Sequence, residues 1–268
     1  MKQDLSTKII CSFSGGRTSA FMANLLLQNY KRDDLLFVFA NTGKENPETL
    51  DFINECDKRW NLGVVWIEAV VNFEKGKGTG YRIVDYKTAS RNGEPFSDVN
   101  KKYGIPNKHQ PHCTRELKEV PIKKFVRDVC GSKYKMAIGI RADERTRINR
   151  SRAAKFKWVY PLVDDFPTTK RMVKDFWKAQ DFDLQLDDYL GNCDLCWKKS
   201  LKKRMKILHE NPSIGDWWEK EEMKDEYVFD RSGLTIQEVK EKAKLKASQI
   251  SLFDLSNESQ CSCFSNIV

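Results

Sequence analysis

Long apolar runs are missing from this chain of 268 residues. Its longest unbroken stretches, such as Leu35 to Ala40, are far too short to cross a bilayer. The first residues, Met1 to Asp4, lack the apolar core of a secretory signal peptide. Repeats and low-complexity segments are also missing. We therefore expect a cytoplasmic protein that contacts no membrane and has no framework of structural disulfides.

Positive charge, by contrast, is in excess. The chain has 47 Lys and Arg against 38 Asp and Glu, a formal net charge of +9. Much of the excess lies in residues 141–152 and 198–204. Such clusters are most often solvated surface, but the charge also fits an anionic ligand. Charge alone does not choose between a small nucleotide and a tRNA or DNA.

The order of apolar segments predicts an α/β fold. Strands are expected near 8–13, 35–40, 63–70 and 135–140, with helices near 17–29, 47–60 and 116–129. This alternation is typical of a mostly parallel sheet with helices on both faces. From about Pro167 the pattern is helical, and Trp217, Trp218 and Phe229 are predicted to be packing residues. We expect a nucleotide-binding domain at 1–165, a helical region at 166–250 and a flexible tail at 251–268. The Gly- and Pro-rich stretch 75–112 is predicted to be a flexible cover over the ligand.

The most informative stretch is residues 9–19, an apolar run followed by Ser14-Gly15-Gly16 and an amphipathic helix pattern. The unpaired N–H groups and positive dipole end of such a helix form a site for phosphate or sulfate. Glycine lets the backbone approach the anion, and Thr18 and Ser19 add hydroxyl donors. On its own, this turn could equally be a tight connection.

A second strand-to-helix turn follows the buried run 35–40. Asn46 and Pro47 are typical of an N-cap and a first helical residue. Two such turns at the carboxyl ends of neighbouring parallel strands would lie where open α/β sheets bind ligands.

Eight cysteines form the other strong feature. Cys11, Cys56 and Cys130 lie in apolar patterns and are predicted to be buried small hydrophobes. Cys193 and Cys196 form a Cys-x-x-Cys turn that aims two thiolates at one ion. We expect the following helix and Lys198-Lys199 to lower the pKa of both thiols. Further sulfur or nitrogen ligands are available in His112, Cys113, Cys261 and Cys263; both zinc and an iron–sulfur cluster stay open at this point.

Four motifs in this order resemble the PP-loop fold of the PAPS reductase family, relatives of the N-type ATP pyrophosphatases. They are Ser14 to Ser19, Asn41 to Thr49, Cys113 to Lys118 with Pro121, and Gly139 to Glu144 with Arg147, and the likeness spans roughly residues 8 to 200. It implies an adenine nucleotide or sulfonucleotide (PAPS, APS or ATP) as substrate. The residues expected to bind it are Ser14, Gly15, Gly16, Arg17, Thr18, Ser19, Asn41, Thr42, Gly43, Glu45, Arg141 and Arg147. ATP-cleaving members usually carry Asp at the position of Thr18, which argues against ATP hydrolysis.

The resemblance also implies a 4Fe–4S cluster. In iron–sulfur members, a pair of adjacent cysteines precedes a Cys-x-x-Cys at the spacing that separates Cys113 from Cys193 here. We therefore expect Cys113, Cys193 and Cys196 to be ligands, with zinc or no metal as the alternatives. His112 stands where the family has the first cysteine of the pair. The fourth ligand would be His112, a tail cysteine or an exogenous sulfur.

Catalytic roles follow from the same likeness. Lys118 resembles a lysine near sulfate and cluster, and Cys261 or Cys263 is placed like the tail thiol that attacks the sulfate sulfur in sulfonucleotide reductases. The Glu-Cys-Gly-Leu-His context of that thiol is absent. The preferred interpretation is reduction of a sulfonucleotide to sulfite, with a thioredoxin-like reductant. The alternatives are ATP-dependent adenylation and sulfur transfer on tRNA or DNA, and a non-catalytic protein that binds nucleotide or nucleic acid.

Overall fold

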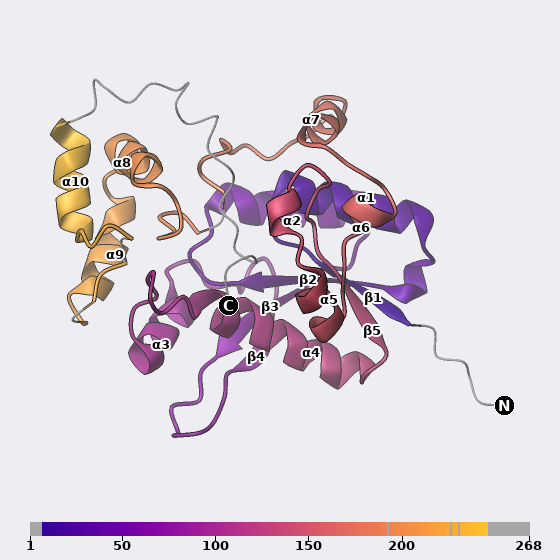
Figure 1. Ribbon diagram of the computed structural model, residues 1–268, viewed down its shortest axis with the longest axis horizontal. Coiled ribbons are helices and arrows are strands. Elements are labelled where there is room, and N and C mark those ends of the chain that lie inside the picture. The colour runs from indigo at the N-terminus through magenta and orange to yellow at the C-terminus, as the bar shows by residue number, and fades with distance from the viewer. Residues whose placement is uncertain (1–6, 192, 226, 230, 246–268) are drawn as a thin grey trace.

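A six-stranded sheet forms the centre of the computed structural model, which describes residues 7–191, 193–225, 227–229 and 231–245 (Figure 1). The strand order is β4-β3-β2-β1-β5-β6, and all neighbours are parallel except β3 and β4. The strands are β1 Lys8–Ser12, β2 Leu35–Asn41, β3 Val65–Val70, β4 Gly80–Val84, β5 Tyr134–Ala137 and β6 Trp158–Val159. This confirms the predicted α/β fold.

Helices cover both faces of the sheet. In Figure 1, α1 and α2 lie on one side of the strands, and α3 and α4 lie on the other. The helices are α1 Arg17–Asn29, α2 Pro47–Trp60, α3 Glu94–Tyr103, α4 Val120–Cys130, α5 Arg150–Phe156, α6 Pro161–Asp164, α7 Lys170–Lys178, α8 Leu201–Glu210, α9 Ile214–Glu222 and α10 Ile236–Leu245. The short turns are η1 Arg32–Asp34, η2 Arg115–Glu119 and η3 Arg145–Arg147. Among the described residues, no helix is long and apolar enough to cross a membrane.

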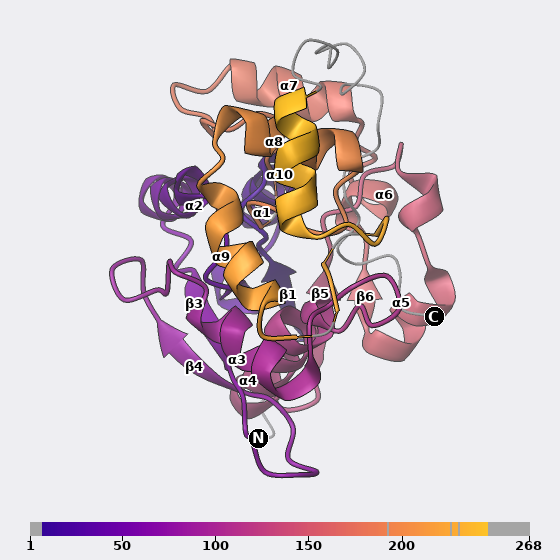
Figure 2. The ribbon, with the colours of Figure 1, turned by 90° about the vertical axis from the view of Figure 1, so that its left-hand side faces the viewer.

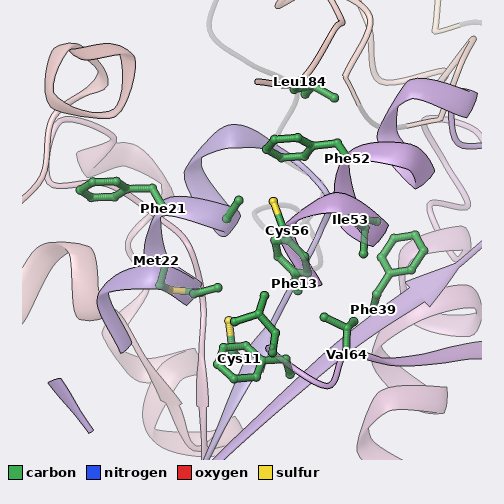
Figure 3. Close-up of a cluster of buried hydrophobic side chains, with 14 of the residues drawn as sticks. Cys11, Phe13, Phe21, Met22, Phe39, Phe52, Ile53, Cys56, Val64 and Leu184 are labelled. Carbon is green, nitrogen blue, oxygen red and sulfur yellow. The ribbon is translucent and has the colours of Figure 1, made fainter. Parts of the chain in front are cut away.

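Alternate side chains of the strands supply two cores. Cys11 and Phe39 belong to the buried cluster that packs against α1 and α2 (Figure 3), whereas Ile10 and Val38 belong to the cluster against α4. This is the period of two expected for a strand buried on both faces. Cys11 and Cys56 are fully buried, as predicted. Cys130 is only partly buried, because it lies in the last turn of α4.

The region after residue 165 divides between two cores. Trp177 of α7 packs on Phe52 of α2, with ring centroids 5.0 Å apart, and so extends the sheet core. Helices α8, α9 and α10 lie together (Figure 2) over a separate apolar cluster. In that cluster, Phe96 of α3 contacts Trp218 and Phe229, which are fully buried packing residues as predicted. The predicted tail, 251–268, lies outside the described residues.

The stretch 75–112 is not the flexible cover that its glycines and prolines suggested. It supplies the antiparallel edge strand β4 and the helix α3, which packs against α9. Several of its glycines are used for backbone geometry instead. Gly93, for example, has φ +86°, and a Cβ there would lie 2.5 Å from the Trp217 ring. Helix α3 thereby joins the sheet to the C-terminal helices.

Candidate functional site

The turn between β1 and α1 has the geometry of an anion site. Gly16 is the N-cap of α1, and no side chain caps the helix N-terminus within the described part of the chain. The amides of the first turn are therefore available to a ligand. A Cβ on Gly16 would point into open space, 4.0 Å from the nearest atom, Ser14 Oγ. Ser19 Oγ braces the turn by accepting from Ser14 N at 3.2 Å and donating to the Gly16 carbonyl at 2.8 Å.

Gly15 has a different task from Gly16. Its φ is +77°, and a Cβ at this position would lie 2.5 Å from Thr49 Cγ2 and 2.8 Å from Ile53 Cδ1 of α2. The turn must therefore pass tightly over α2, which only glycine permits. Gly15 shapes the loop, and Gly16 leaves room above it.

A pocket of about 560 Å³ opens over this loop, a volume within the range of small-molecule sites. All six residues from Ser14 to Ser19 line it, together with Gly139, Arg141 and Arg147 from the segment after β5. Because β1 and β5 are neighbours with their following helices on opposite faces, this is the point where open α/β sheets bind ligands. Of the two further motifs predicted to bind the ligand, the segment after β5 lines this pocket, whereas only Thr49 of the motif 41–49 does so among the described residues.

The pocket is strongly basic. Its lining includes nine Lys or Arg residues and three carboxylates: Arg17, Arg141, Arg147, Lys170, Lys174, Lys198, Lys199, Lys203 and Arg231 against Glu144, Asp187 and Asp188. Glu144 is engaged by Arg147 at 2.6 Å, and Asp143 by Arg141 at 2.9 Å. These carboxylates orient the two arginines. The Nε of Arg147 is buried and has no hydrogen-bond partner among the described residues, so it is available to a ligand.

Thr18 contacts Arg141 directly. The Arg141 Nη1 donates to Thr18 Oγ1 at 3.2 Å, and both residues line the pocket. An aspartate at this position would form an ion pair with the same guanidinium. With threonine, the charge of Arg141 is left to its partners in the segment 143–144 and to whatever binds in the pocket.

Arg17 lines the pocket, but its guanidinium is occupied elsewhere. It donates to Asp183 at 2.7 Å, to the Leu186 carbonyl at 3.1 Å and to the Leu184 carbonyl. The segment 184–191, most of which lines the pocket, is thereby tied to the start of α1. Sequence reasoning gave Arg17 a role in binding the ligand and missed this segment, because the contact joins residues far apart in the chain.

The loop after β2 has another use. Asn41 is fully buried and donates to Glu68 of β3 at 2.6 Å, while its side-chain oxygen accepts from Gly43 N at 3.2 Å. Glu45 accepts from the N–H and hydroxyl of Thr42, both at 2.9 Å. Among the described residues, the large pocket is not lined by Lys118 or by any of the four residues predicted from this loop, Asn41, Thr42, Gly43 and Glu45. Their role in nucleotide binding stays a prediction.

The same loop forms the floor of a second, small pocket that contains three thiols. Cys113, Cys193 and Cys196 line it, with Thr42, Lys118 and Lys198 among the other residues. Cys113 precedes the π-helical turn η2, where Pro121 cannot donate the N–H that an α-helix would need. Cys193 pairs with Glu45 in an isolated antiparallel bridge, and its Sγ lies 3.6 Å from Thr42 Oγ1. The three cysteines that were predicted to be ligands thus line one pocket, and their role as ligands stays a prediction.

Lys118 also lies at this pocket, where its Nζ is 3.4 Å from the Glu45 carboxylate. His112 does not line the pocket among the described residues. Its Nε2 lies 3.1 Å from the Gly104 carbonyl, and burial lowers the pKa of its ring. Cys261 and Cys263 lie outside the described residues, so their predicted roles stay predictions.

The expected thiol acidity is wrong for Cys193. Burial raises the pKa of its thiol well above the usual value, and the neighbouring Glu45 carboxylate adds to the increase, while Lys118 opposes it. Helix α8 begins only at Leu201, and its N-cap Ser200 accepts from Lys203 N. The helix N-terminus is therefore too far along the chain to act directly on the thiols.

The three thiols are not gathered around a single ion. No group of three His, Cys, Asp or Glu side chains in the described part of the chain is close enough to hold one metal ion. A tetrahedral zinc would draw its sulfurs to within roughly 4 Å of one another, given Zn–S bonds of about 2.3 Å. A cluster binds each thiolate through a different iron, so its ligands lie farther apart. A cluster at this pocket stays a prediction.

The two pockets share a wall. Lys198 lines both, and the segment 191–200 that carries Cys193 and Cys196 separates them. The sequence analysis noted Lys198 and Lys199 only as surplus charge. It could not show that they lie between a nucleotide-sized pocket and the thiols.

The chain is similar to several known proteins. An uncharacterised nin region protein, ORF290, of Escherichia phage lambda is 38% identical over 199 residues, which cover 72% of this chain and 67% of that protein. An uncharacterised protein of Methanocaldococcus jannaschii is 23% identical over 237 residues, which cover 81% of this chain but 42% of that protein. The solved U34-tRNA thiolase NcsA from Methanococcus maripaludis, with its 4Fe-4S cluster, aligns at 16% identity and a TM-score of 0.44 over 98% of this chain and 82% of that one. At that TM-score the alignment supports no conclusion about function.

The family is shown by a match to a family model. Residues 8–181 match the model of the phosphoadenosine phosphosulfate reductase domain. The match begins at β1 and ends just after α7, so it includes both the loop 14–19 and the arginines that follow β5. The chain belongs to the phosphoadenosine phosphosulfate reductase family.

Proposed function

We propose that this protein binds a sulfonucleotide in the large pocket and reduces it to sulfite beside a 4Fe–4S cluster held by Cys113, Cys193 and Cys196. The observation that carries the proposal is the shared wall: a basic, nucleotide-sized pocket and a three-thiol pocket both contact Lys198. Family membership supports the adenine nucleotide.

The binding step uses the residues already described. The amides at the start of α1 would hold phosphate, and Arg141 and Arg147 would hold phosphate or sulfate through their guanidinium forks. Of the three carboxylates in the pocket, Glu144 and Asp188 are already in ion pairs with basic side chains. The pocket lining therefore has an excess of positive charge that suits a polyanion, although Arg17 and Lys199 are bound to groups of the chain itself. This favours a sulfonucleotide over Mg·ATP.

The chemical step needs a thiolate nucleophile, for which we propose Cys261 or Cys263. The thiolate would attack the sulfate sulfur, forming an S–S bond as the S–O bond to the nucleotide phosphate breaks. The bonding pair leaves with the nucleotide, and the cysteine retains an S-sulfonate. A dithiol of the thioredoxin class then attacks the cysteine sulfur, releases sulfite and is itself oxidised to a disulfide once the mixed disulfide resolves. Basic side chains would stabilise the charge on the leaving phosphate.

The cluster would be held from two sides of its pocket, by Cys113 before η2 and by Cys193 and Cys196 from the segment 191–200. When bound, it would supply an iron centre close to the sulfate. Lys118, which lines this pocket and contacts Glu45, would place a positive charge beside the thiolates.

A second candidate, sulfur transfer to a nucleic acid after ATP-dependent adenylation, is favoured by one surface. Phe156 and Trp158 stack at 5.5 Å, and Lys123, Lys155 and Arg152 lie over these rings. Interleaved cations and aromatic rings suit single-stranded nucleic acid. The surface follows directly on the pocket-lining arginines in the chain.

One anaerobic assay separates the candidates. The full-length protein, purified with its iron, is incubated with ATP, adenylyl sulfate or phosphoadenylyl sulfate, with a dithiol and with or without tRNA or DNA. We expect sulfite from a sulfonucleotide, and none from a Cys261→Ser, Cys263→Ser double variant. Pyrophosphate formed from ATP only when nucleic acid is present would support the second candidate. Iron-replete protein that yields neither product would refute both.

A further inference from the structure

Two buried lysines hold the loop that carries Cys193 and Cys196. We propose that Lys199 and Lys44 are positioning residues that keep this loop closed and preformed against the sheet, with Lys199 also connecting it to the nucleotide pocket. The inference rests on the proposed function only in treating these thiols as functional. Its test requires neither the cluster nor a substrate.

Lys199 binds the backbone of the loop. Its ammonium group donates to the carbonyls of Cys193 at 3.0 Å and Leu190 at 3.5 Å, and to that of Gly191. The residue is only 3% exposed. Three carbonyls match the three N–H donors of an ammonium, so burial of the charge is compensated. Without Lys199, these three carbonyls would lose their shared hydrogen-bond donor, and the loop would lose the contact that holds its backbone together.

Lys44 holds the loop from the other side. Its Nζ lies 2.8 Å from Asp194 Oδ2, and its carbonyl accepts from Asp194 N at 2.8 Å. The other carboxylate oxygen of Asp194 accepts from Trp218 Nε1 at 2.8 Å. The ion-paired side chains are 10% and 13% exposed. Asp194 stands between the two cysteines in the chain, so this contact fixes the centre of the loop.

Further contacts at the ends of the loop act in the same direction. Asn46 was predicted as the N-cap of α2, and it does occupy that position, but its side-chain amide donates to the Leu190 carbonyl at 2.8 Å instead of capping the helix. Together with the Glu45–Cys193 bridge, this docks the segment 190–196 on the loop after β2. The motif that follows β2 thus contacts and supports the loop that carries Cys193 and Cys196.

These lysines differ from those that face the thiols. Lys118 and Lys198 line the thiol pocket, whereas neither Lys199 nor Lys44 does so within the described residues. Lys199 lines the nucleotide pocket instead, as does Gly191, whose carbonyl it binds. Lys199 therefore acts on the thiols only through the loop backbone. Because its ammonium group binds the carbonyls of both Gly191 and Cys193, it couples the position of Gly191 in the nucleotide pocket to that of Cys193.

The test is alkylation of each cysteine in the full-length protein as purified. Wild type, Lys199→Met and Lys202→Met are treated anaerobically with iodoacetamide without denaturant, and each cysteine is followed by mass spectrometry. Lys202 is the matched control, because it is a nearby lysine that lies exposed in the first turn of α8. We expect Cys193 and Cys196 to react about tenfold faster in Lys199→Met, equal to ~1.4 kcal/mol in loop opening. Loss of a positive charge would disfavour the thiolate and slow the reaction, so faster labelling reports opening of the loop.

Cys11 and Cys56 serve as internal reporters of global unfolding, because both are fully buried in the sheet core. The proposal predicts that they stay unlabelled. Cys193 and Cys196 rates within twofold of Lys202→Met would overturn it. Parallel labelling of Cys11 and Cys56 would show general destabilisation instead. In that event the deciding variant is Asp194→Asn, which keeps the side-chain shape but removes the ion pair with Lys44. Its Cys193 and Cys196 must react several-fold faster than in wild type while Cys11 and Cys56 stay protected. Any other result would show that the proposal is wrong.

Discussion

The two pockets at the carboxyl edge of the sheet share Lys198 but are built in different ways. The nucleotide pocket is wide and basic, and its floor is a short loop in which six consecutive residues face the ligand space. The thiol pocket is small and buried, and its three cysteines come from two segments far apart in the chain. The first depends on local backbone geometry, and the second on tertiary packing. Substitutions should therefore affect them in different ways.

Gly15→Ala should give the largest effect, a loss of about 3 kcal/mol of unfolding free energy. The estimate combines roughly 1–2 kcal/mol for a non-glycine residue in the left-handed region with about 1–3 kcal/mol for overpacking against Thr49 and Ile53. Urea unfolding of the purified variant measures it. A variant within about 0.5 kcal/mol of wild type, the limit for a neutral surface change, would show that the turn can move away from α2.

Gly16→Val should affect the ligand and leave the fold intact. The residue has an extended conformation, with φ −96°, and open space above it, so a branched side chain fits but fills the place of the anion. We expect adenylyl sulfate binding to weaken by at least ~30-fold, equal to about 2 kcal/mol. Unfolding free energy should change by less than about 1 kcal/mol, the scale of an N-cap effect. Calorimetry and urea unfolding measure the two quantities; normal binding would place the anion elsewhere.

These glycines also show what the sequence could predict. A strand, a glycine turn and a helix start within a dozen residues indicate an anion site, because the amides that would bind the anion all lie within that stretch. The close approach of Gly15 to Thr49 and Ile53 could not be read from this local pattern. The grouping of Cys113 with Cys193 and Cys196 came from the family resemblance, because no local pattern brings such distant residues together.

Other parts of the site could not be predicted from the sequence for a related reason. The ion pair of Lys44 with Asp194 and the clamp of Arg17 on the segment 183–188 join residues separated by most of the domain. The stretch 75–112 was misread because its glycines serve close packing, as Gly93 does against Trp217, and not flexibility. A high glycine content shows that the backbone can adopt unusual conformations. Only the tertiary contacts show whether those conformations serve close packing or flexibility.

Thr18→Asp should have an intermediate effect on the nucleotide pocket. The new carboxylate would pair with Arg141, which now donates to the Thr18 hydroxyl at 3.2 Å, and would repel an anionic ligand. We expect metal-free adenylyl sulfate to bind about tenfold more weakly, or ~1.4 kcal/mol. Thr18→Ser keeps the hydroxyl and should bind nearly as wild type. Equal affinities of the Asp and Ser variants in calorimetry would remove Arg141 from the binding site.

The smallest effect should come from Glu119, whose ion pair with Arg152 connects η2 to α5. It ends η2, the turn that follows Cys113, and pairs with Arg152 of α5 at 3.1 Å. Burial raises the pKa of its carboxyl despite the attraction of Arg152. The folded state therefore binds the proton more tightly than the unfolded state. The stabilisation from protonation is complete below the unfolded pKa and is lost as the pH rises through the folded value. Glu119→Gln lacks this titration, so the stability of wild type relative to the variant should fall as the pH rises above the ordinary carboxyl pKa of 4.5. The amount should be about 1 kcal/mol or less, as for a partly exposed ion pair. Urea unfolding at several pH values measures it. A difference that stays constant with pH would mean that Glu119 is ionised equally in both states, and that Arg152 fully compensates its burial.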